Sequence, residues 1–523
     1  MQSPAIRIAK EMSLEVIIVD GNKDAEFAKC GDKFLHIDLK DKELIADAAV
    51  KLKTSGGLHG IFTAGTDFSA SVAYAAEKAG LPGIPYEIAL NASDKARMRA
   101  CFEKAGVRSP KFSVVEKDNL NSVTLTSFPL VVKPVDNMGG RGCRKVGSRD
   151  ELKSALEDAV KFSRSGRVIV EDYMDGPEYS IDSIVYDGKI TICGIADRHI
   201  FFPPYFIEMG HTIPSALDDD AREHLVSVFE QGVRSLGITM GAAKGDVKLT
   251  KDGAAIGEIA ARLSGGYMSG WTYPYSSGVE LTRAAILIAL GKKPQNTKPL
   301  FSKTSAERAF ISIPGIIHFI KNAENAENLE HIENIFLRVG KGSIVDFPVN
   351  NVSKCGNVIA CAAQRVDAVN AAEHVVKEVL FALECPNAIT ENFLNGTVFN
   401  RASSRQGVED VEGVENFPPD AFTVSSSIKE ALSKLPQSRI VCNAHTGKPA
   451  IVGFKAFVES GLTDYVGRTV EESLDAVRSL SGLELPVIDG ELPDDCVLFA
   501  REFWQALIRG GYQGGAYMIE KSA

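Results

Sequence analysis

The sequence predicts a multidomain protein that combines α/β and α+β architecture. The chain has 523 residues, and because domains average about 150 residues, three or four domains are expected. Apolar strand-like runs alternate with helical stretches near the N-terminus, which is typical of a parallel α/β sheet. Further along the chain, strand pairs joined by short turns predict antiparallel hairpins. The hydrophobic fraction of 45% and the charged fraction of 24% are ordinary for folded domains.

Composition and charge exclude several classes of protein. Lys and Arg number 58 against 68 Asp and Glu, a net charge of −10, which disfavours a nucleic-acid partner. The nine cysteines form no C-x-x-C pair, so neither a disulfide framework nor a zinc site is indicated. The N-terminus lacks a signal-peptide core, and the apolar run at 284–290 is too short to span a membrane. We therefore expect a cytoplasmic protein with no membrane partner.

The first ninety residues are predicted to form one Rossmann-like domain. Strand-like runs occur at LEVIIVD (14–20) and HGIFTAG (59–65), and helical stretches at 42–53 and 68–80. This alternation favours a small doubly wound sheet over residues 1–90.

Residues 91–300 contain the elements of a second module, with a lid over about 110–185. The helix 91–106 has Ser93 or Asp94 as candidate caps and ends at Gly106. The other predicted elements are a strand at 129–134, a Gly-rich loop at 136–142, a helix at 149–162, a strand at 167–174, a hairpin at 180–197 with an Asp187-Gly188 turn, a helix at 219–236 and a hairpin at 245–262.

The remaining chain is predicted to form two further parts. Residues 301–395 mix helix and strand, with a helix near 367–384. Residues 396–523 contain a polar, acidic linker at 402–420 and helical stretches at 427–435, 469–480 and 497–509. The sequence assigns no role to this last part.

Several pieces of the second module suit a nucleoside triphosphate. Glycines in the loop let backbone N–H groups approach phosphate oxygens, and lysines supply positive charge to them. A strand end can offer backbone groups to an adenine edge, and a following carboxylate can bind ribose hydroxyls. The candidate nucleotide-binding residues are Lys95, Lys133, Gly139, Gly140, Gly142, Glu171, Asp172, Tyr173, Met174 and Glu178.

The hairpin at 245–262 carries the candidate metal ligands, Asp246 and Glu258. A three-residue loop over 251–253 pairs Thr250 with Ala254 and places Asp246 opposite Glu258 on one face. Two facing carboxylates can hold Mg²⁺, or Mn²⁺, against phosphates. A two-residue Asp252-Gly253 turn would separate the carboxylates to opposite faces and remove the site.

These motifs, in this order, resemble the ATP-grasp superfamily over residues 1–300. The segments that carry the resemblance are SDKARMRACFEKAGVRSP, PLVVKP with its Gly-rich loop, EDYMDGPEYSID and Asp246 followed by EIAARL. Residues 301–385 more loosely resemble the C-terminal domain of biotin carboxylase and its relatives. The resemblance implies a core of two α+β subdomains, ATP and Mg²⁺ as cofactors, and a homodimer.

The resemblance also implies a reaction and its residues. ATP-grasp enzymes typically convert a carboxylate to an acyl phosphate, which an amine attacks as ADP and phosphate are released. By resemblance, Arg262, Lys133, His211 and Glu208 are the candidate catalytic residues, and Arg262 with Ser264, Gly265 and Gly266 the candidate substrate contacts. We therefore expect a carboxylate–amine ligase acting on small molecules, with amino acids as one candidate class.

Two departures from the family pattern keep other functions open. Many members carry Glu-x-Asn where this chain has Glu258-Ile-Ala260, and Ala260 cannot bind a second metal. Members also usually begin with a strand and a Gly-rich turn before a helix like SPAIRIAKEM, so Met1 is a candidate late start. The alternatives are a biotin carboxylase-like or purine-pathway carboxylase and a nucleotide-binding regulatory protein without catalysis.

Overall fold

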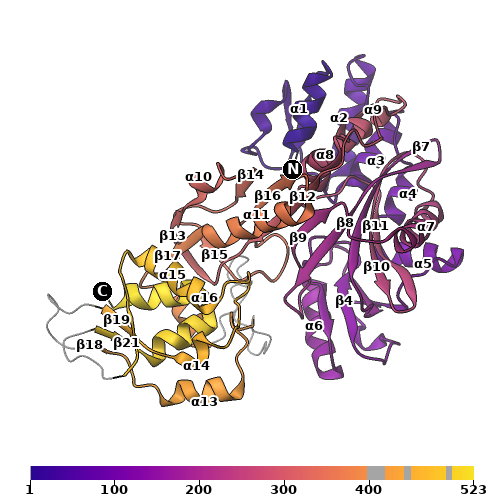
Figure 1. Ribbon diagram of the computed structural model, residues 1–523. Coiled ribbons are helices and arrows are strands. Elements are labelled where there is room, and N and C mark those ends of the chain that lie inside the picture. Colours follow the sequence, from indigo (N-terminus) through magenta and orange to yellow (C-terminus); the bar gives the residue numbers. More distant parts are fainter. Residues whose placement is uncertain (1, 397–418, 441–448, 491–496, 523) are drawn as a thin grey trace. The chain divides into compact units, whose positions relative to one another are not determined.

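The computed structural model describes residues 2–396, 419–440, 449–490 and 497–522 (Figure 1). The chain divides into two compact units, one formed by Met1–Glu307 with Ile359–Val369, the other by Arg308–Val358 with Asn370–Ala523. Both contain helices and sheets, so the predicted mixture of α/β and α+β architecture is confirmed. Throughout the described part of the chain, every helix is too short or too polar to cross a lipid bilayer.

The N-terminal part of the first unit differs from the predicted Rossmann-like domain. Strand β1 (Ile17–Asp20) pairs in parallel with β2 (Lys33–His36), and within residues 2–90 this pair is the whole sheet. The strand predicted at 59–65 is wrong, because these residues form no strand. An apolar run becomes a strand only when a neighbouring backbone pairs with it. The helices here are α1 (Ser3–Glu11), α2 (Lys42–Thr54), α3 (Ser69–Lys78) and α4 (Tyr86–Asn91).

A four-stranded antiparallel sheet covered by one helix follows. Its strand order is β3-β6-β4-β5, formed by β3 (Phe112–Glu116), β6 (Arg167–Asp172), β4 (Leu130–Pro134) and β5 (Arg144–Val146). Helix α6 (Arg149–Phe162) has the predicted bounds and begins where the Ser148 side chain accepts a hydrogen bond from the Glu151 N–H. Its apolar face packs Leu152 and Leu156 onto the sheet.

The large sheet of the first unit carries the site. The five strands in the order β11-β10-β7-β8-β9 are β11 (Gly253–Ala260), β10 (Gly241–Thr250), β7 (Glu178–Tyr186), β8 (Lys189–Phe201) and β9 (Ile207–Ile213). Strands β12 (Thr304–Phe310) and β16 (Gly356–Ala362) continue it, and the division between the units falls within both. Tyr186 pairs with Lys189, so the predicted Asp187-Gly188 turn is confirmed.

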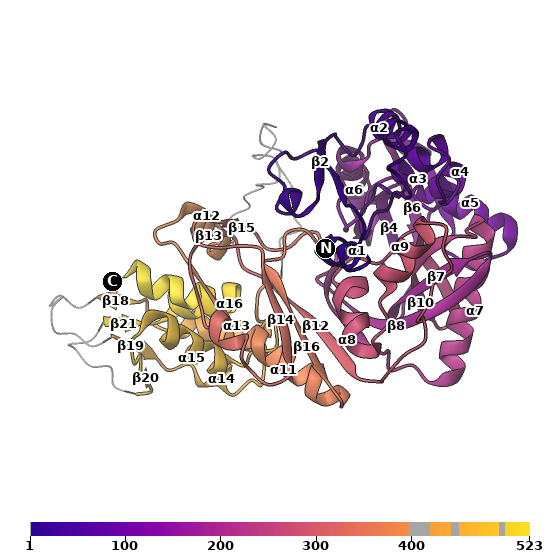
Figure 2. The same cartoon turned by 90° about the horizontal axis from the view of Figure 1, so that it is seen from above.

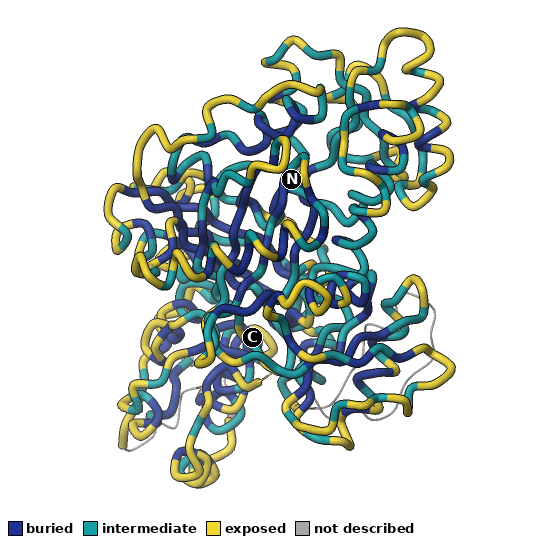
Figure 3. Tube along the Cα trace, turned by 90° about the vertical axis from the view of Figure 1, so that its right-hand side faces the viewer, coloured by how far each residue is buried: buried dark blue, intermediate teal, exposed yellow. Residues whose placement is uncertain are grey.

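Two helices cover one face of this sheet, and the other face carries helix α9 over part of its area and polar side chains elsewhere. Helices α5 (Lys95–Ala105) and α7 (Asp219–Leu236) lie beside β10 and β11 (Figure 1), and the tube in Figure 3 marks the buried parts of the chain in dark blue. Phe102 and Phe229 of these helices belong to one buried cluster with Ile256 and Ile259. Because side chains alternate along a strand, Asp246 and Glu258 lie on the opposite face. Helices α8 (Tyr273–Ser277) and α9 (Leu281–Ala289) complete the described helices of this segment, together with the π-helix Met268–Thr272.

The β10–β11 hairpin has the predicted pairing of Asp246 with Glu258, but its loop and register differ from the prediction. Asp246 lies opposite Glu258, as expected, but Thr250 pairs with Gly253 rather than with Ala254. The predicted three-residue loop is therefore wrong, and the loop is Lys251-Asp252. The register shifts by one residue between Asp246 and Val247, where Gly257 has no partner in the ladder. This bulge compensates for the shorter loop and keeps both carboxylates on one face.

The second unit contains two small sheets, of order β15-β13-β17 and β18-β21-β19-β20 (Figure 2). Their strands are β13 (Gly315–Lys321), β15 (Ile344–Val345), β17 (Leu380–Leu383), β18 (Arg439–Ile440), β19 (Pro449–Val452), β20 (Val487–Ile488) and β21 (Val497–Phe499), whereas β14 (Ile332–Leu337) is the last strand in the order of the large sheet, after β16. The helices are α10 (Ala323–Ala326), α11 (Arg365–Glu378), α12 (Ala388–Leu394), α13 (Ser426–Lys434), α14 (Lys455–Val458), α15 (Val470–Ser481) and α16 (Arg501–Lys521).

Aromatic side chains form the core of this unit. Phe422, Phe457 and Phe503 pack around the fully buried Trp504 of α16. Helix α16 continues through the Gly-rich segment beyond 509 and kinks at Gly511, whose φ of 60° and ψ of −150° are not helical. The helix predicted near 367–384 ends at Glu378, and residues 380–383 form the buried strand β17. A short apolar run that is buried on both faces shows no hydrophobic periodicity that would distinguish a strand from a helix. Most of the predicted linker at 402–420 lies outside the described residues.

Candidate active site

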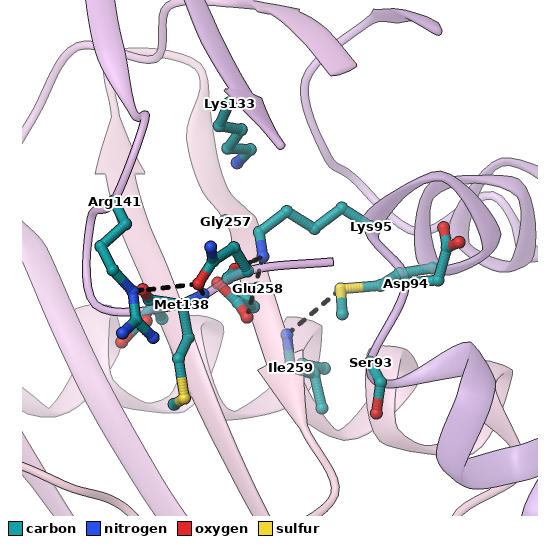
Figure 4. A network of polar contacts seen from close by, with 12 residues as sticks. Ser93, Asp94, Lys95, Lys133, Met138, Arg141, Gly257, Glu258 and Ile259 are labelled. Atoms are coloured by element: carbon teal, nitrogen blue, oxygen red, sulfur yellow. Dashed lines mark hydrogen bonds and ion pairs between the residues drawn. The ribbon is translucent and has the colours of Figure 1, made fainter. Parts of the chain in front are cut away.

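The N-terminus of α5 presents Lys95 to the polar face of the large sheet. Asp94 caps the helix by accepting hydrogen bonds from the N–H groups of Ala96 and Arg97, which fixes Lys95 as its first residue. The Lys95 Nζ donates to the Asn137 carbonyl at 2.8 Å and lies 3.5 Å from Glu258 Oε1. Figure 4 shows this ammonium directed at the Glu258 carboxylate. The structure thus joins the predicted phosphate-binding lysine to a predicted metal ligand.

Lys133, on β4, is held by a buried carboxylate. Its Nζ lies 2.7 Å from Glu171 Oε2, and Arg99 Nε donates to Glu171 Oε1 at 2.8 Å. Burial alone would raise the pKa of Glu171, but Arg99 and Lys133 outweigh it and hold that pKa below its usual value. The Glu171 side chain therefore positions Lys133 and is not available to a nucleotide.

The strand end after Glu171 is partly occupied by the protein's own hydrogen bonds. The Asp172 N–H donates to the Lys111 carbonyl, and the Tyr173 N–H donates to the Pro129 carbonyl. An adenine edge would therefore have to use the remaining backbone groups of this segment, which ends at Met174.

The Gly-rich loop between β4 and β5 depends on its glycines. Gly139, Gly140 and Gly142 have φ angles of 71°, 76° and 66°, a region that other residues rarely adopt. A Cβ on Gly142 would also lie 2.9 Å from the Phe162 ring. Within the loop, Arg141 Nε donates to the Asn137 side chain at 3.0 Å (Figure 4). The loop backbone thus turns back close to Lys95.

The facing carboxylates fit a magnesium ion carried by a nucleotide. Burial would raise the pKa of Glu258, but Lys95 and Lys133 lower it to about 2, so the group is ionised. Among the described residues, no group of three or more His, Cys, Asp or Glu side chains is arranged to hold a metal. Mg²⁺ usually binds through one or two carboxylates together with substrate phosphates, and Asp246 with Glu258 is such a pair.

Arg198, on β8, links three of the predicted site residues. Its Nη1 lies 2.8 Å from Asp246 Oδ1, and its guanidinium also forms ion pairs with Glu178 and Glu208. These partners come from β10, β7 and β9. Glu178 additionally lies 3.6 Å from the Lys248 ammonium. Arg198 therefore connects Glu178, which is expected to bind the ribose, with Asp246 at the expected metal site and Glu208 at the expected substrate site.

Glu208 and His211 meet on β9 with two partners from distant segments. His211 Nδ1 lies 2.6 Å from Glu307 Oε2, and its Nε2 lies 3.4 Å from Glu208 Oε2. A Cβ on Gly266 would lie 3.0 Å from Glu208 Oε1 and 3.2 Å from His211 Cε1. The structure thus brings three of the predicted substrate-side residues together.

Arg262 and Ser264 lie just beyond the end of β11. Arg262 Nη1 donates to the Leu263 carbonyl at 2.8 Å, and burial lowers the pKa of its guanidinium although Glu258 and Asp246 oppose the change. The Ser264 N–H donates to Asp182 Oδ1 at 3.2 Å. This N–H is therefore engaged, and Gly265 and Gly266 remain as the predicted backbone contacts to an acid.

The His211 cluster predicts that the stability of the ligand-free protein depends on pH. Burial would lower the pKa of His211, but Glu208 and Glu307 raise it from 6.5 to about 9. Its contribution to stability is therefore complete below pH 6.5 and is lost as pH rises through 9. Since one pKa unit corresponds to about 1.4 kcal/mol, the loss is expected to reach about 3 kcal/mol.

Thermal unfolding between pH 6 and about 9.5 measures this effect. The decline with rising pH is expected in the natural chain and should be largely absent from His211→Gln. An equal decline in both proteins would show that other groups cause it.

Sequence reasoning missed four residues of this region: Arg99, Arg198, Lys244 and Glu307. Arg99 follows Lys95 by one helical turn, and Lys244 precedes Asp246 by two strand positions, so periodicity could have indicated both. Arg198 lies opposite Glu178 in the β7–β8 hairpin, which its turn could have revealed. Glu307 is 96 residues from His211 and carries no local signal.

In comparison with known proteins, two family models match separate segments of the chain. The family model described as ATP-grasp domain matches residues 126–270. The family model described as L-amino acid ligase C-terminal domain 2 matches residues 309–384.

The relatives include two ligases named for amino-acid substrates. Alanine–anticapsin ligase of Bacillus subtilis is 28% identical over 276 residues, which cover 46% of this chain and 58% of the relative. D-alanine–D-alanine ligase B of Pseudomonas putida is 29% identical over 167 residues, which cover 30% of this chain and 52% of the relative. The chain thus spans little more than half the length of these two relatives.

The solved structures show the same fold. The L-amino acid ligase from Bacillus licheniformis superimposes with a TM-score of 0.64 at 22% identity, covering 73% of this chain and 95% of that one. Biotin carboxylase from Campylobacter jejuni gives a TM-score of 0.55 at 19% identity, covering 77% and 96%. Residues 126–270 thus match an ATP-grasp domain and residues 309–384 match the second C-terminal domain of L-amino acid ligases, and the site geometry agrees with the first match.

Proposed function

We propose that the protein is an ATP-dependent ligase that joins a small carboxylate, of the amino-acid class, to an amine. The arrangement of charge on one sheet face supports this most directly. The ionised Glu258 lies beside the Lys95 ammonium and opposite Asp246. Arg262 follows Glu258 by four residues, just beyond the end of β11. A phosphoryl donor and a carboxylate acceptor can therefore meet over these residues.

Each part of the arrangement has a task in this reaction. Lys95 and Lys133 bind the ATP phosphates, and the Gly-rich loop covers them and limits access of water. Asp246 and Glu258 would hold Mg²⁺, which supplies positive charge to the phosphates when bound. Arg262 binds the substrate carboxylate, and its planar fork suits both that group and the acyl phosphate.

The bonds formed and broken balance without a covalent enzyme intermediate. A carboxylate oxygen takes the γ-phosphoryl group of ATP, which leaves ADP and an acyl phosphate. The amine nitrogen then attacks the acyl carbon, phosphate leaves, and the nitrogen loses a proton as the amide forms. Glu208 fits an ammonium group, and His211, cationic below about pH 9 and fully buried between Glu208 and Glu307, holds the Glu208 carboxylate in place.

The relatives favour amino acids over other carboxylates. Alanine–anticapsin ligase and D-alanine–D-alanine ligase are named for amino-acid substrates, and they match 46% and 30% of this chain. We further propose a cytoplasmic homodimer, for which light scattering of the purified protein gives the molar mass.

The proposal is tested by ADP and phosphate release with Mg-ATP and amino acids, supplied singly and in pairs. Release that requires a pair, together with a condensed product in the mass spectrum, is the expected result. Release that instead requires bicarbonate would favour the carboxylase fold relatives. Tight ATP binding without release in any mixture would contradict ligase activity and favour a regulatory role.

A further inference from the structure

Lys244 places a fixed positive charge beside the metal carboxylates. It lies two residues before Asp246 on β10, so both side chains project from the same face. In the sheet, Lys244 pairs with Ala260 on one side and with Asp182 on the other. The Lys244 ammonium forms an ion pair with Asp246 Oδ1, and the side chain is 12% exposed. The alanine methyl group leaves room for the ammonium and offers no oxygen to a metal.

The two carboxylates of the site differ in their surroundings. Asp246 Oδ1 contacts two cations, since Arg198 Nη1 lies 2.8 Å from the same oxygen that Lys244 contacts. The Asp246 side chain is 15% exposed, whereas that of Glu258 is 32% exposed. Glu258 is therefore the more accessible oxygen ligand, and a divalent ion next to Asp246 would meet two positive charges already in place.

Asp182 does not offset these charges with a second free carboxylate. It is 1% exposed, and its Oδ1 accepts a hydrogen bond from the Ser264 N–H. Burial raises the pKa of this carboxyl, so its negative charge is disfavoured. Asp182, Lys244 and Ala260, which are paired across three neighbouring strands, thus offer a bound nucleotide one ammonium group and no oxygen ligand comparable to Glu258.

We propose that the Lys244 ammonium takes the place of a second magnesium ion, so that this enzyme binds its nucleotide with a single metal held chiefly by Glu258. The inference rests on the proposed Mg-nucleotide site. An ammonium group can donate hydrogen bonds to phosphate oxygens and neutralise their charge without a coordination shell. Asp246 then orients Lys244 through Oδ1 and contributes less than Glu258 to the single metal.

The experiment counts bound Mn²⁺ per chain by electron paramagnetic resonance, with a non-hydrolysable ATP analogue at saturation. Equilibrium dialysis on the same samples measures the bound analogue and shows that the site is folded. We expect one Mn²⁺ per bound analogue in the natural chain. We expect two in the double variant Lys244→Ala with Ala260→Asn, which removes the ammonium and supplies an oxygen ligand.

A matched control removes a neighbouring lysine. Lys248 lies on the same strand and face as Lys244, but its ion pair is with Glu178. Lys248→Met should keep a single Mn²⁺, and a second ion there would overturn the assignment to Lys244. Two Mn²⁺ ions in the natural chain would overturn the inference and leave the ligase proposal intact. Bound analogue without any Mn²⁺ would overturn both.

Discussion

Replacing Glu258 by Gln is expected to lower the rate of ATP-dependent ADP release by about two to three orders of magnitude. The substitution keeps the size of the side chain but removes its charge. The natural carboxylate, with a pKa of about 2, stays ionised at every working pH. Without it, the Lys95 ammonium 3.5 Å away loses its carboxylate partner and keeps the Asn137 carbonyl, and the proposed single metal loses its main protein ligand. Steady-state assays at saturating concentrations of the substrate pair that the release assay selects measure the rate constant.

The loss must be separated from damage to the fold. Glu103→Gln, on the exposed side of the same α5 helix that carries Lys95, provides the matched control and should retain the natural rate. Thermal unfolding of both variants should remain close to that of the natural chain. If Glu258→Gln keeps more than about a tenth of the natural rate, the loss is smaller than that expected for one transition-state contact. Glu258 would then not be the main ligand of the metal.

Local signals explain which elements could be predicted from the sequence. Asp94 and Gly106 bound α5 because a capping carboxylate and a left-handed glycine act within one helical turn. The Asp187-Gly188 turn is defined by two residues that tolerate positive φ. The pairing of Asp246 with Glu258 could be predicted for a different reason. The loop has two residues instead of the predicted three, which by strand alternation alone would move Glu258 to the face opposite Asp246. The bulge at Gly257 shifts the register by one residue and returns Glu258 to the face of Asp246.

Features that depend on distant segments could not be predicted in this way. The strand expected at 59–65 required a pairing partner that its own residues do not specify. Glu307 reaches His211 across 96 residues, and its role follows only from the order of strands in the sheet. Glu171 was expected to face the nucleotide, but its side chain is buried between two cations. A carboxylate in a motif indicates that a negative charge is needed there. Only the packing shows which positively charged group that carboxylate pairs with.

That burial makes Glu171→Gln the substitution with the largest expected effect on stability. The change leaves Arg99, which is fully buried, and Lys133 without their shared carboxylate. Removing one partner of a buried ion pair typically costs about 3–5 kcal/mol, because the remaining charge is desolvated without compensation. Hydrogen exchange of the amides in β4 and β6 measures the opening free energy of this sheet directly.

The pH dependence of the same amides distinguishes a lost charge interaction from a packing defect. The pKa of Glu171 lies below its usual value of 4.5 in the folded protein, so its contribution is present above pH 4.5 and falls as the pH drops further. The natural chain should therefore lose protection in β4 and β6 on acidification, and Glu171→Gln should start low and change less. The double variant Glu171→Gln with Arg99→Met should be more stable than the sum of the two single losses predicts, because it removes one of the stranded cations. Additive losses would instead show that Arg99 and Glu171 stabilise the sheet independently, and that Lys133 is positioned by its own strand.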